Sequence, residues 1–139
     1  MDAQDFAPFI PTYRMGEAPF LARDFEHRNV KLPNADSAVI PPEKLRDYLL
    51  SSSHPVGRFK AAFFRALGYT DDDWERLEGD IRSVLTNDAM VGEQTGYGQK
   101  LEVRGNITGP AGRNAEIVTA WIILKGESIP RFITAYPGN

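Results

Sequence analysis

The stretch Glu116-Ile-Val-Thr-Ala-Trp-Ile-Ile-Leu124 is apolar on both faces of an extended chain. A strand with two apolar faces has to be covered on both sides, which is typical of the centre of a sheet. The turn signals around it, Thr108-Gly-Pro-Ala-Gly112 and Lys125-Gly-Glu127, leave only short connections to the next extended segments. Because short connections join antiparallel neighbours, the stretch predicts an antiparallel sheet with this strand inside it.

Two flanking segments are expected to supply the neighbouring strands. Lys100-Leu-Glu-Val-Arg104 alternates between apolar and charged residues, as a strand with one buried face does. Arg131-Phe-Ile-Thr-Ala-Tyr136 precedes Pro137 and predicts the last strand. The glycine-rich run from Gly92 to Gly98 lacks the strand-then-helix context of a phosphate-binding loop, so a loop or hairpin is expected there. The predicted strands lie near 99–105, 115–125 and 130–136.

The segment before these strands carries helix signals. Pro42 suits the first position of a helix, and Gly68 suits the left-handed residue that follows a helix end. Thr70 and Asp73 form a Thr-x-x-Asp capping box ahead of a stripe of apolar residues. The predicted helices lie near 42–50, 55–67 and 71–85. The fold class is therefore α+β, with N-terminal helices packed on an antiparallel meander sheet of three to four strands.

Residues 1–31 differ from the rest of the chain. Prolines interrupt scattered aromatic residues there, and neither a helical nor a strand period is sustained. We expect an irregular N-terminal arm over 1–31 and a single compact α+β domain over 32–139.

Composition excludes several classes of function. The chain has 139 residues and a net charge of −3, so it is not a generic nucleic-acid-binding protein of high positive charge. It has no cysteine and only two histidines, His27 and His54, which argues against a metal site. No cofactor fingerprint is present, so neither a metal nor an organic cofactor is expected. No apolar run is long enough to span a bilayer, so no membrane association is expected either.

The predicted helix over 55–67 has an unusual distribution of polar groups. Pro55 suits its first position and places His54 at the N-cap. At helical spacing Lys60 falls on the apolar side of the helix, in a stripe with Gly57. This arrangement leaves room for a ligand between an imidazole and an ammonium group. The alternative is that Lys60 only packs its stem on the apolar surface and holds its charge in water.

The strands add further polar candidates. Phe132, Thr134 and Tyr136 alternate along the last strand and are predicted to share one face, and Thr119 and Trp121 share a face of the central strand. A histidine, a lysine, a threonine and a tyrosine supply a base, an acid and charge stabilisation for phosphodiester chemistry without metal. The alternative is an ordinary solvated strand face. Three segments contain no acidic residue: 48–70, 103–115 and 128–139. If these acid-free segments converge, they make one face basic through His54, Arg58, Lys60, Arg65, Arg104, Arg113 and Arg131.

These motifs in combination resemble a small bacterial family of unknown function. The first half carries Leu32-Pro-Asn-Ala-Asp36, His54-Pro-Val-Gly57, Lys60-Ala61 and Phe63-Phe64, and the second carries Gly109-Pro-Ala-Gly112, Thr119-Ala-Trp121 and Thr134-Ala-Tyr-Pro137. The resemblance covers about residues 32–137. It implies a domain that occurs alone or at the C-termini of large secreted proteins described as adhesins.

The order of helices before a meander, with a Thr-Ala-Tyr-Pro ending, also resembles the barnase–EndoU–colicin–RelE ribonuclease superfamily. This resemblance implies a toxin of a toxin–immunity or toxin–antitoxin system, with RNA as substrate and a cognate immunity or antitoxin protein as partner. The domain lacks the second histidine of a two-histidine acid–base pair. Lys60 or Tyr136 would then have to act as the acid or the charge stabiliser.

The leading hypothesis is therefore a metal-independent ribonuclease-like toxin domain, cytoplasmic or delivered as part of a toxin system. His54 would take the proton of a ribose 2′-hydroxyl, and Lys60 and Arg131 would stabilise the negative charge of the phosphorane. Thr134 would bind a phosphate oxygen. Substrate binding is assigned to Gly57, Trp121, Tyr136, Arg104 and Arg113, with Trp121 or Tyr136 stacking on a base. The alternative is a non-catalytic module that binds a protein through a basic cleft.

Overall fold

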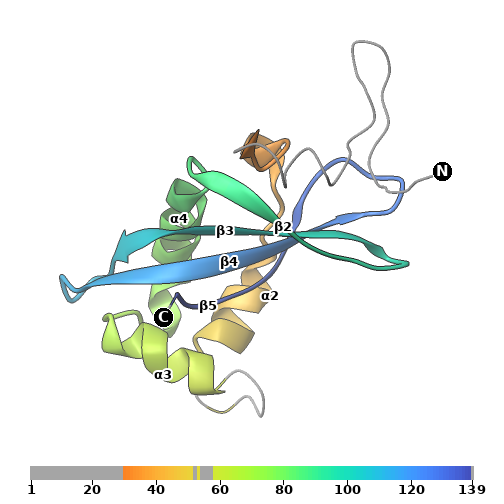
Figure 1. Cartoon of the computed structure of the whole chain (residues 1–139). Coiled ribbons are helices and arrows are strands. Elements are labelled where there is room, and N and C mark those ends of the chain that lie inside the picture. The colour runs from red at the N-terminus through yellow and green to blue at the C-terminus, as the bar shows by residue number, and fades with distance from the viewer. Residues whose placement is uncertain (1–29, 52, 54–57, 139) are drawn as a thin grey trace.

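The computed structural model of the chain describes residues 30–51, 53 and 58–138. A short strand comes first, the helices follow, and four longer strands complete the chain (Figure 1). The elements are β1 (Val30–Lys31), a 3-10 turn η1 (Ala35–Ser37), α2 (Pro42–Lys44), a π-helical turn η2 (Leu45–Leu49), α3 (Arg58–Ala66), a 3-10 turn η3 (Asp71–Asp73), α4 (Trp74–Val84), β2 (Asp88–Gln94), β3 (Gly98–Thr108), β4 (Asn114–Leu124) and β5 (Arg131–Pro137).

The strands form one antiparallel meander in the order β1-β2-β3-β4-β5. The α+β class and the antiparallel sheet are confirmed, and β4 has a neighbour on each side, as its two apolar faces predict. Over the described residues the sheet has five strands, so the prediction of three to four is wrong. The helices lie between β1 and β2 in the chain and are not N-terminal to the whole sheet.

The two unpredicted strands carry weak local signals. β1 has only two residues, Val30 and Lys31, which pair with Ala89 and Asp88 of β2. β2 breaks its register between Val91 and Gln94, where it enters the predicted glycine-rich hairpin. Too few alternating positions remain in either strand for a sequence pattern to indicate it. The division between arm and domain at residues 31 and 32 stays a prediction.

The predicted helices are present, and their local signals hold wherever the structure describes them. The Asp73 carboxylate accepts hydrogen bonds from the Thr70 backbone N–H at 2.8 Å and from the Thr70 hydroxyl at 3.0 Å, ahead of α4. At the end of α3, Gly68 takes a φ of 103°, and the Tyr69 N–H bonds back to the Phe64 carbonyl at 3.1 Å. This pattern is the Schellman ending that glycine favours. The start of the helix predicted over 55–67 lies outside the described residues.

The core lies between the helices and one face of the sheet. α4 packs on β3, and α3 packs against η2 and β5. In Figure 1 the strands cross in front of α4, so the helices form one layer and the sheet the other. The largest wholly buried side chains come from both layers: Trp121, Tyr69, Phe64, Leu45, Leu49, Leu50, Leu77, Ile81, Leu101, Ile117, Ile123 and Gln99.

An irregularity in β5 positions the site described below. The register of β5 slips by one residue beside Ala120 and Trp121, which makes Ile133 the extra residue of a bulge. Phe132 therefore lies opposite Trp121 on the core face, whereas Thr134 lies opposite Ala120 on the other face. The prediction that Phe132, Thr134 and Tyr136 share one face is wrong for Phe132, because the bulge reverses the alternation.

The outer edge of β5 runs beside the first helical segment. The Val39 N–H donates to the Pro130 carbonyl and the Phe132 N–H donates to the Val39 carbonyl, each at 2.9 Å. The chain continues from there into α2 and η2, which places their side chains beside the bulge.

Candidate functional site

Lys60 of α3 contacts a tyrosine hydroxyl of the neighbouring helical turn. Its Nζ donates a hydrogen bond of 3.1 Å to the hydroxyl oxygen of Tyr48, which lies on η2. Both side chains are half-buried. The ammonium group of Lys60 is therefore directed at a neutral oxygen acceptor.

Two further polar groups of the β5 edge lie at this contact. The Lys44 Nζ donates to the carbonyl of Ile133, the bulge residue, at 3.1 Å. The Thr134 hydroxyl oxygen is shielded from solvent and, among the described residues, completes no hydrogen bond of ordinary geometry. It nevertheless lies near enough to Tyr48 to lower the pKa of that hydroxyl. We call Lys44, Tyr48, Lys60 and Thr134 the Tyr48 cluster.

Electrostatics of the cluster favour the ionised form of Tyr48. The hydrogen bond from Lys60 is the main cause that lowers the pKa of Tyr48 below its usual value, and partial burial opposes it. The charges of Lys60 and Lys44 and the Thr134 hydroxyl lower the pKa further. Positive charge and hydrogen-bond donors stabilise a phenolate more than a phenol, which is why all these groups act in one direction.

Within the part of the chain that the structure describes, neither lysine of the cluster is paired with an acid. Among residues 30–51, 53 and 58–138, no carboxylate forms an ion pair with Lys44 or Lys60. Two ammonium groups and two hydroxyls therefore gather at one place where α3, η2, α2 and β5 meet. Such a set of donors binds an anion, and a phosphate group in particular.

Two of the predicted substrate-binding residues form a second polar group farther along β5. The Tyr136 hydroxyl donates to Glu102 Oε2 at 2.8 Å, and Arg104 Nη1 donates to the Gly138 carbonyl at 2.9 Å. Arg104 and Tyr136 both lie opposite Val118, one on each side of β4. Burial is the main cause that raises the pKa of Tyr136, and Glu102 raises it further. Thr134 and Tyr136 are two residues apart on the same strand, which separates their backbones by about 7 Å.

Trp121 is part of the core, and the prediction that it stacks on a base is wrong. Its side chain is wholly buried, and its ring packs edge-on against Phe132 at 5.3 Å between centroids. Its indole N–H donates to the Thr119 hydroxyl at 2.8 Å, and that hydroxyl donates to the Val103 carbonyl at 2.9 Å. The shared face of Thr119 and Trp121 is therefore the core face, where this chain of bonds satisfies both polar groups.

The remaining arginines lie elsewhere. Arg131 donates hydrogen bonds to both oxygens of the Glu127 carboxylate, at 3.0 and 3.2 Å, and this hydrogen bonding raises the pKa of Arg131.

Arg113 is exposed in the hairpin between β3 and β4. The Ala111 N–H of that hairpin donates to the Leu67 carbonyl, at the C-terminal end of α3. Lys60 lies two turns earlier on α3, so the fold does not gather Arg113 with the Tyr48 cluster.

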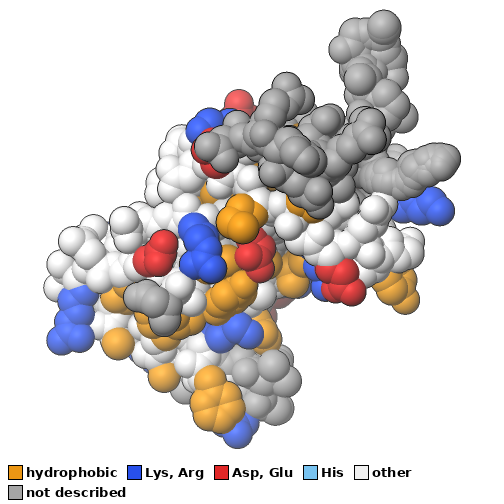
Figure 2. Space-filling model, viewed as in Figure 1, with side chains coloured by type: hydrophobic (Ala, Val, Ile, Leu, Met, Phe, Trp, Pro, Cys, Tyr) orange, Lys and Arg blue, Asp and Glu red, His pale blue; other side chains and the backbone are white. Residues whose placement is uncertain are grey.

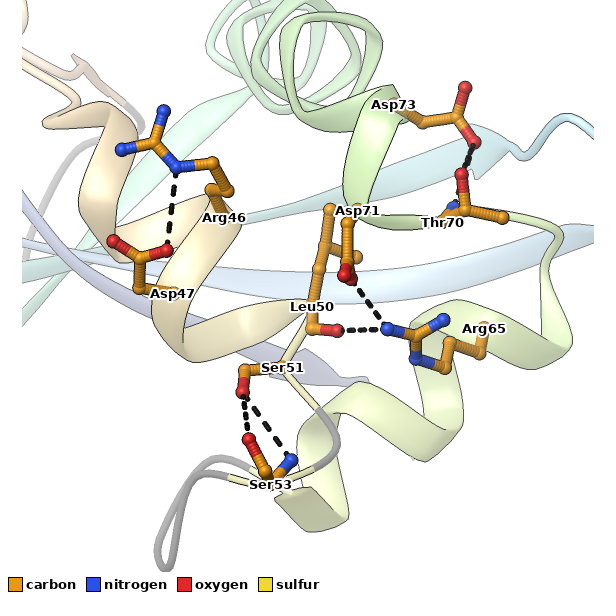
Figure 3. Close-up of polar contacts among 9 residues, drawn as sticks. All are labelled: Arg46, Asp47, Leu50, Ser51, Ser53, Arg65, Thr70, Asp71 and Asp73. Carbon is orange, nitrogen blue, oxygen red and sulfur yellow. Dashed lines mark hydrogen bonds and ion pairs between the residues drawn. The ribbon is translucent and has the colours of Figure 1, made fainter.

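Figure 3 shows further polar contacts near the start and end of α3 and on η2. Arg46 pairs with Asp47 within η2, and the hydroxyls of Ser51 and Ser53 bond to each other before α3. Arg65 Nη2 donates to the Leu50 carbonyl and to Asp71 Oδ1, each at 2.6 Å. These contacts hold η2, α3 and η3 together, and their positive charges are matched by carboxylates. His54 and Gly57 lie outside the described residues, so their predicted roles stay predictions.

The predicted basic face is not uniform where it can be seen. Figure 2 shows one face of the molecule, with apolar side chains gathered near its middle and both Lys/Arg and Asp/Glu side chains scattered around them. The acid-free segments are interrupted in space by Glu102 and Glu127, which bind Tyr136 and Arg131. Among the described residues, Lys44 and Lys60 of the Tyr48 cluster form no ion pair, and Arg104, Arg113 and Lys125 elsewhere on the domain form none either.

No group of three or more His, Asp or Glu side chains that could hold a metal ion occurs in the part of the chain that the structure describes. Within the same residues, no helix is both long and apolar enough to cross a membrane.

Sequence reasoning identified Lys60 and Thr134 but missed Tyr48 and Lys44. Tyr48 falls within the helix predicted near 42–50, and nothing in that prediction distinguished it from its neighbours. A lysine and a tyrosine twelve residues apart on separate helical segments have no fixed geometry until those segments pack. The available signal was the lysine on the apolar side of α3, which indicated that a polar partner would be needed there.

The matched family model covers residues 31–139 and is described as a domain of unknown function, DUF6883. The chain belongs to the DUF6883 family. The matched range closely follows the 32–137 range of the resemblance drawn from the motifs. No curated protein sequence matches this DUF6883 chain.

The fold of this DUF6883 domain is similar to that of a chain in a solved structure. That chain belongs to a contact-dependent growth inhibition toxin–immunity protein complex from Klebsiella pneumoniae 342, with a TM-score of 0.57. The similarity covers 76% of this chain and 97% of that chain, at 21% sequence identity. At this identity the likeness establishes a shared fold.

Proposed function

We propose that this DUF6883 chain is a toxin domain of a bacterial toxin–immunity system and that it cleaves RNA without a metal ion. The observation that carries the proposal is the Tyr48 cluster, in which two lysines and two hydroxyls meet with no carboxylate among the described residues. The shared fold with a chain of a toxin–immunity complex supports the toxin system. The helix-then-meander order supports the ribonuclease superfamily as the source of the chemistry.

The proposed reaction uses the ribose 2′-hydroxyl as the nucleophile. His54 takes its proton, and Lys60 and Lys44 stabilise the negative charge that builds on the phosphate oxygens. Thr134 binds one of these oxygens by a hydrogen bond. Arg131 remains a candidate for charge stabilisation only if substrate displaces Glu127, which now holds it at 3.0 Å.

Substrate binding extends from the cluster along β5. Tyr136 and Arg104 lie on the same sheet face as Thr134, about one nucleotide of extended backbone farther on. Gly57 is proposed to let the RNA backbone approach the start of the helix, and Arg113 to add positive charge at the periphery. The substrate class is single-stranded RNA, because its bases and phosphates are accessible without melting a duplex.

The physiological partner in this proposal is a cognate immunity protein that binds the toxin in the producing cell. The toxin would be made in the cytoplasm and delivered to a target cell as part of a larger system. An immunity protein would then protect the producer by covering the Tyr48 cluster.

Controlled expression of the chain in bacteria tests the proposal. Wild-type protein is expected to stop growth and to fragment cellular RNA, and His54→Ala to do neither at an equal protein level. Purified wild-type protein is expected to cleave the same RNA in the presence of EDTA. Normal growth with intact RNA at a verified level of folded wild-type protein would contradict the proposal.

One observation favours a non-catalytic binding module instead. Phe59 is 71% exposed at the start of α3, with the Arg58 guanidinium 4.6 Å from its ring centroid. An exposed aromatic residue beside a basic one is typical of the central contacts of protein interfaces. In that case the protein encoded beside this chain would bind it, Phe59→Ala would weaken that complex, and the purified chain would leave RNA intact.

A further inference from the structure

The sheet face turned away from the core carries a glutamate between two cations. Glu102 lies on β3, and Lys100 and Arg104 lie two residues before and after it on the same face. Lys100 pairs with Glu93 at 3.7 Å, and Arg104 donates to the carbonyl of Gly138. Among the described residues, Glu102 itself forms no ion pair. The two cations offset its negative charge, so a phosphate chain can pass close to it.

The Glu102 carboxylate is held in place by a tyrosine of another strand. The Tyr136 hydroxyl donates to Glu102 Oε2 at 2.8 Å, and this bond runs from β5 to β3 across the central strand β4. Val118 of β4 lies opposite Tyr136 on this face and is wholly buried, as a residue beneath that ring is expected to be. A carboxylate has about four lone-pair sites on its two oxygens, and the Tyr136 hydroxyl uses one of them.

The carboxylate lies within reach of a nucleotide bound at the Tyr48 cluster. Glu102 and Thr134 both lie opposite Ala120, one on each side of β4. Neighbouring strands are about 4.8 Å apart, so the backbones of Glu102 and Thr134 are about 10 Å apart. A single nucleotide spans a distance of this order between its phosphate and the far edge of its base. The half-buried ring of Tyr136 lies on the same face and offers a surface on which that base can stack.

We propose that Glu102 recognises the base of the nucleotide whose 3′-phosphate is cleaved, and that it selects guanine. This inference rests on the proposed ribonuclease function. An ionised carboxylate only accepts hydrogen bonds, and it accepts them through two oxygens that lie side by side. Guanine presents two adjacent donors, N1–H and N2–H, on its Watson–Crick edge. The other three RNA bases place an acceptor beside their donor, and that acceptor repels the second carboxylate oxygen.

Binding of mononucleotides to the whole wild-type chain tests the inference without requiring cleavage. Guanosine 3′-phosphate is compared with inosine 3′-phosphate, which lacks the 2-amino group, and with 7-deazaguanosine 3′-phosphate, which keeps both donors. Calorimetry is expected to show binding of the inosine nucleotide at least about tenfold weaker, and about equal binding of the 7-deaza nucleotide. Equal binding of inosine and guanosine nucleotides would overturn the inference. So would a tenfold loss with the 7-deaza nucleotide alone, which would indicate that Arg104 reads the other edge of guanine.

Glu102→Gln tests the residue itself. Glutamine keeps the shape of the side chain and an acceptor for the Tyr136 hydroxyl, but it places an N–H donor against a donor of guanine. The preference for the guanosine over the inosine nucleotide should fall to within about twofold. Glu116→Gln is the matched control, because Glu116 is exposed on the same sheet face and its loss should leave the preference unchanged. A preference that survives in folded Glu102→Gln protein would overturn the inference.

A measurement on wild-type protein covers the case in which Glu102→Gln does not fold. The ¹³C resonance of the Glu102 side-chain carboxylate is followed by NMR while each nucleotide is added. The guanosine nucleotide should shift this resonance more than the inosine nucleotide does at equal occupancy. A resonance that does not move at saturation with the guanosine nucleotide would overturn the inference.

Mapping of the RNA fragments separates this inference from the proposed function. Wild-type protein is expected to leave fragments that end in guanosine with a 2′,3′-cyclic phosphate. Cleavage at similar rates after all four bases would overturn the selection of guanine while the ribonuclease function stands. Selective binding of the guanosine nucleotide with no cleavage of any RNA would overturn the ribonuclease function while recognition of the base by Glu102 stands.

Discussion

The two cations of α3 that point to neighbouring segments have opposite kinds of surroundings. Arg65 donates to the Leu50 carbonyl and to the Asp71 carboxylate (Figure 3). Its positive charge is therefore paired with a carboxylate, and its guanidinium group links α3 to the end of η2 and to η3. Lys60, five residues earlier, donates to the Tyr48 hydroxyl and has no carboxylate partner among the described residues. A cation paired with an acid contributes to the fold, whereas one directed at hydroxyls is available to an added anion. The comparison separates a structural contact from a candidate site on one helix.

The largest expected effect is the loss of RNA cleavage when Lys60 is replaced. Lys60→Met keeps an unbranched apolar stem of similar volume but removes the charge, so RNA cleavage should fall by about 100-fold or more. The free energy of unfolding should change by less than about 1.5 kcal/mol, because the volume is conserved. Rates of RNA cleavage and a thermal melt measure the two effects. Lys125→Met, in the exposed turn between β4 and β5, is the control. An active, well-folded Lys60→Met protein would show that the Tyr48 cluster is not the site.

Arg65 should show the reverse pattern. Arg65→Ala removes both hydrogen bonds at once and should lower the free energy of unfolding by about 1 to 2 kcal/mol, a range that allows for its partial exposure. RNA cleavage by the folded variant should stay near the wild-type rate. Chemical denaturation measures the stability change, with Lys31→Ala, which loses an exposed ion pair to Asp88, as a control of small effect. A large loss of activity at unchanged stability would contradict the structural role of Arg65.

Asp73 predicts a pH dependence of stability. Hydrogen bonds from the Thr70 backbone N–H, and then from its hydroxyl, lower the pKa of Asp73 in the folded chain. Its stabilising contribution is therefore complete above the unfolded value, about 3.9, and is lost as the pH falls through the lower folded-state value. The difference in melting temperature between wild type and Asp73→Asn should shrink as the pH is lowered from about 6 to about 2.5. A difference that stays constant over this range would show that the carboxylate charge does not matter.

The smallest expected effect is that of chelators. The proposed chemistry uses only protein side chains, so EDTA should leave the rate of RNA cleavage unchanged. The comparison is made on the same protein before and after dialysis against EDTA. A rate that falls and then recovers with a divalent ion would contradict the metal-independent mechanism.

Local signals predicted most of the secondary structure. The capping box of Thr70 and Asp73 and the left-handed Gly68 mark helix ends through contacts within a few residues. The strands β3 and β4 were recognisable because their side-chain patterns repeat over eleven residues each. β1 has only two residues, so its sequence contains no period to read.

The candidate site was predictable only in part, because its members are far apart in the sequence. Lys60 stood out as a cation on an apolar helix side, and Thr134 as a polar residue of the last strand. Tyr48 did not stand out, since its contact with Lys60 depends on the packing of η2 against α3. The role of Trp121 was predicted wrongly. A threonine and a tryptophan two residues apart share one face of a strand, and the sequence pattern is the same whether that face is buried or exposed.

The sequence by itself determined the α+β class, the ends of the helices and the antiparallel order of the last three strands, since these follow from neighbouring residues and short connections. Only the tertiary structure decided which side chains meet. The bulge at Ile133 placed Thr134 on the opposite face from Phe132, and the path of residues 39–49 along the β5 edge brought Lys44 and Tyr48 to it. The physical reason is that a register slip of one residue reverses which face each following side chain occupies, and nothing in the local sequence prevents or requires it.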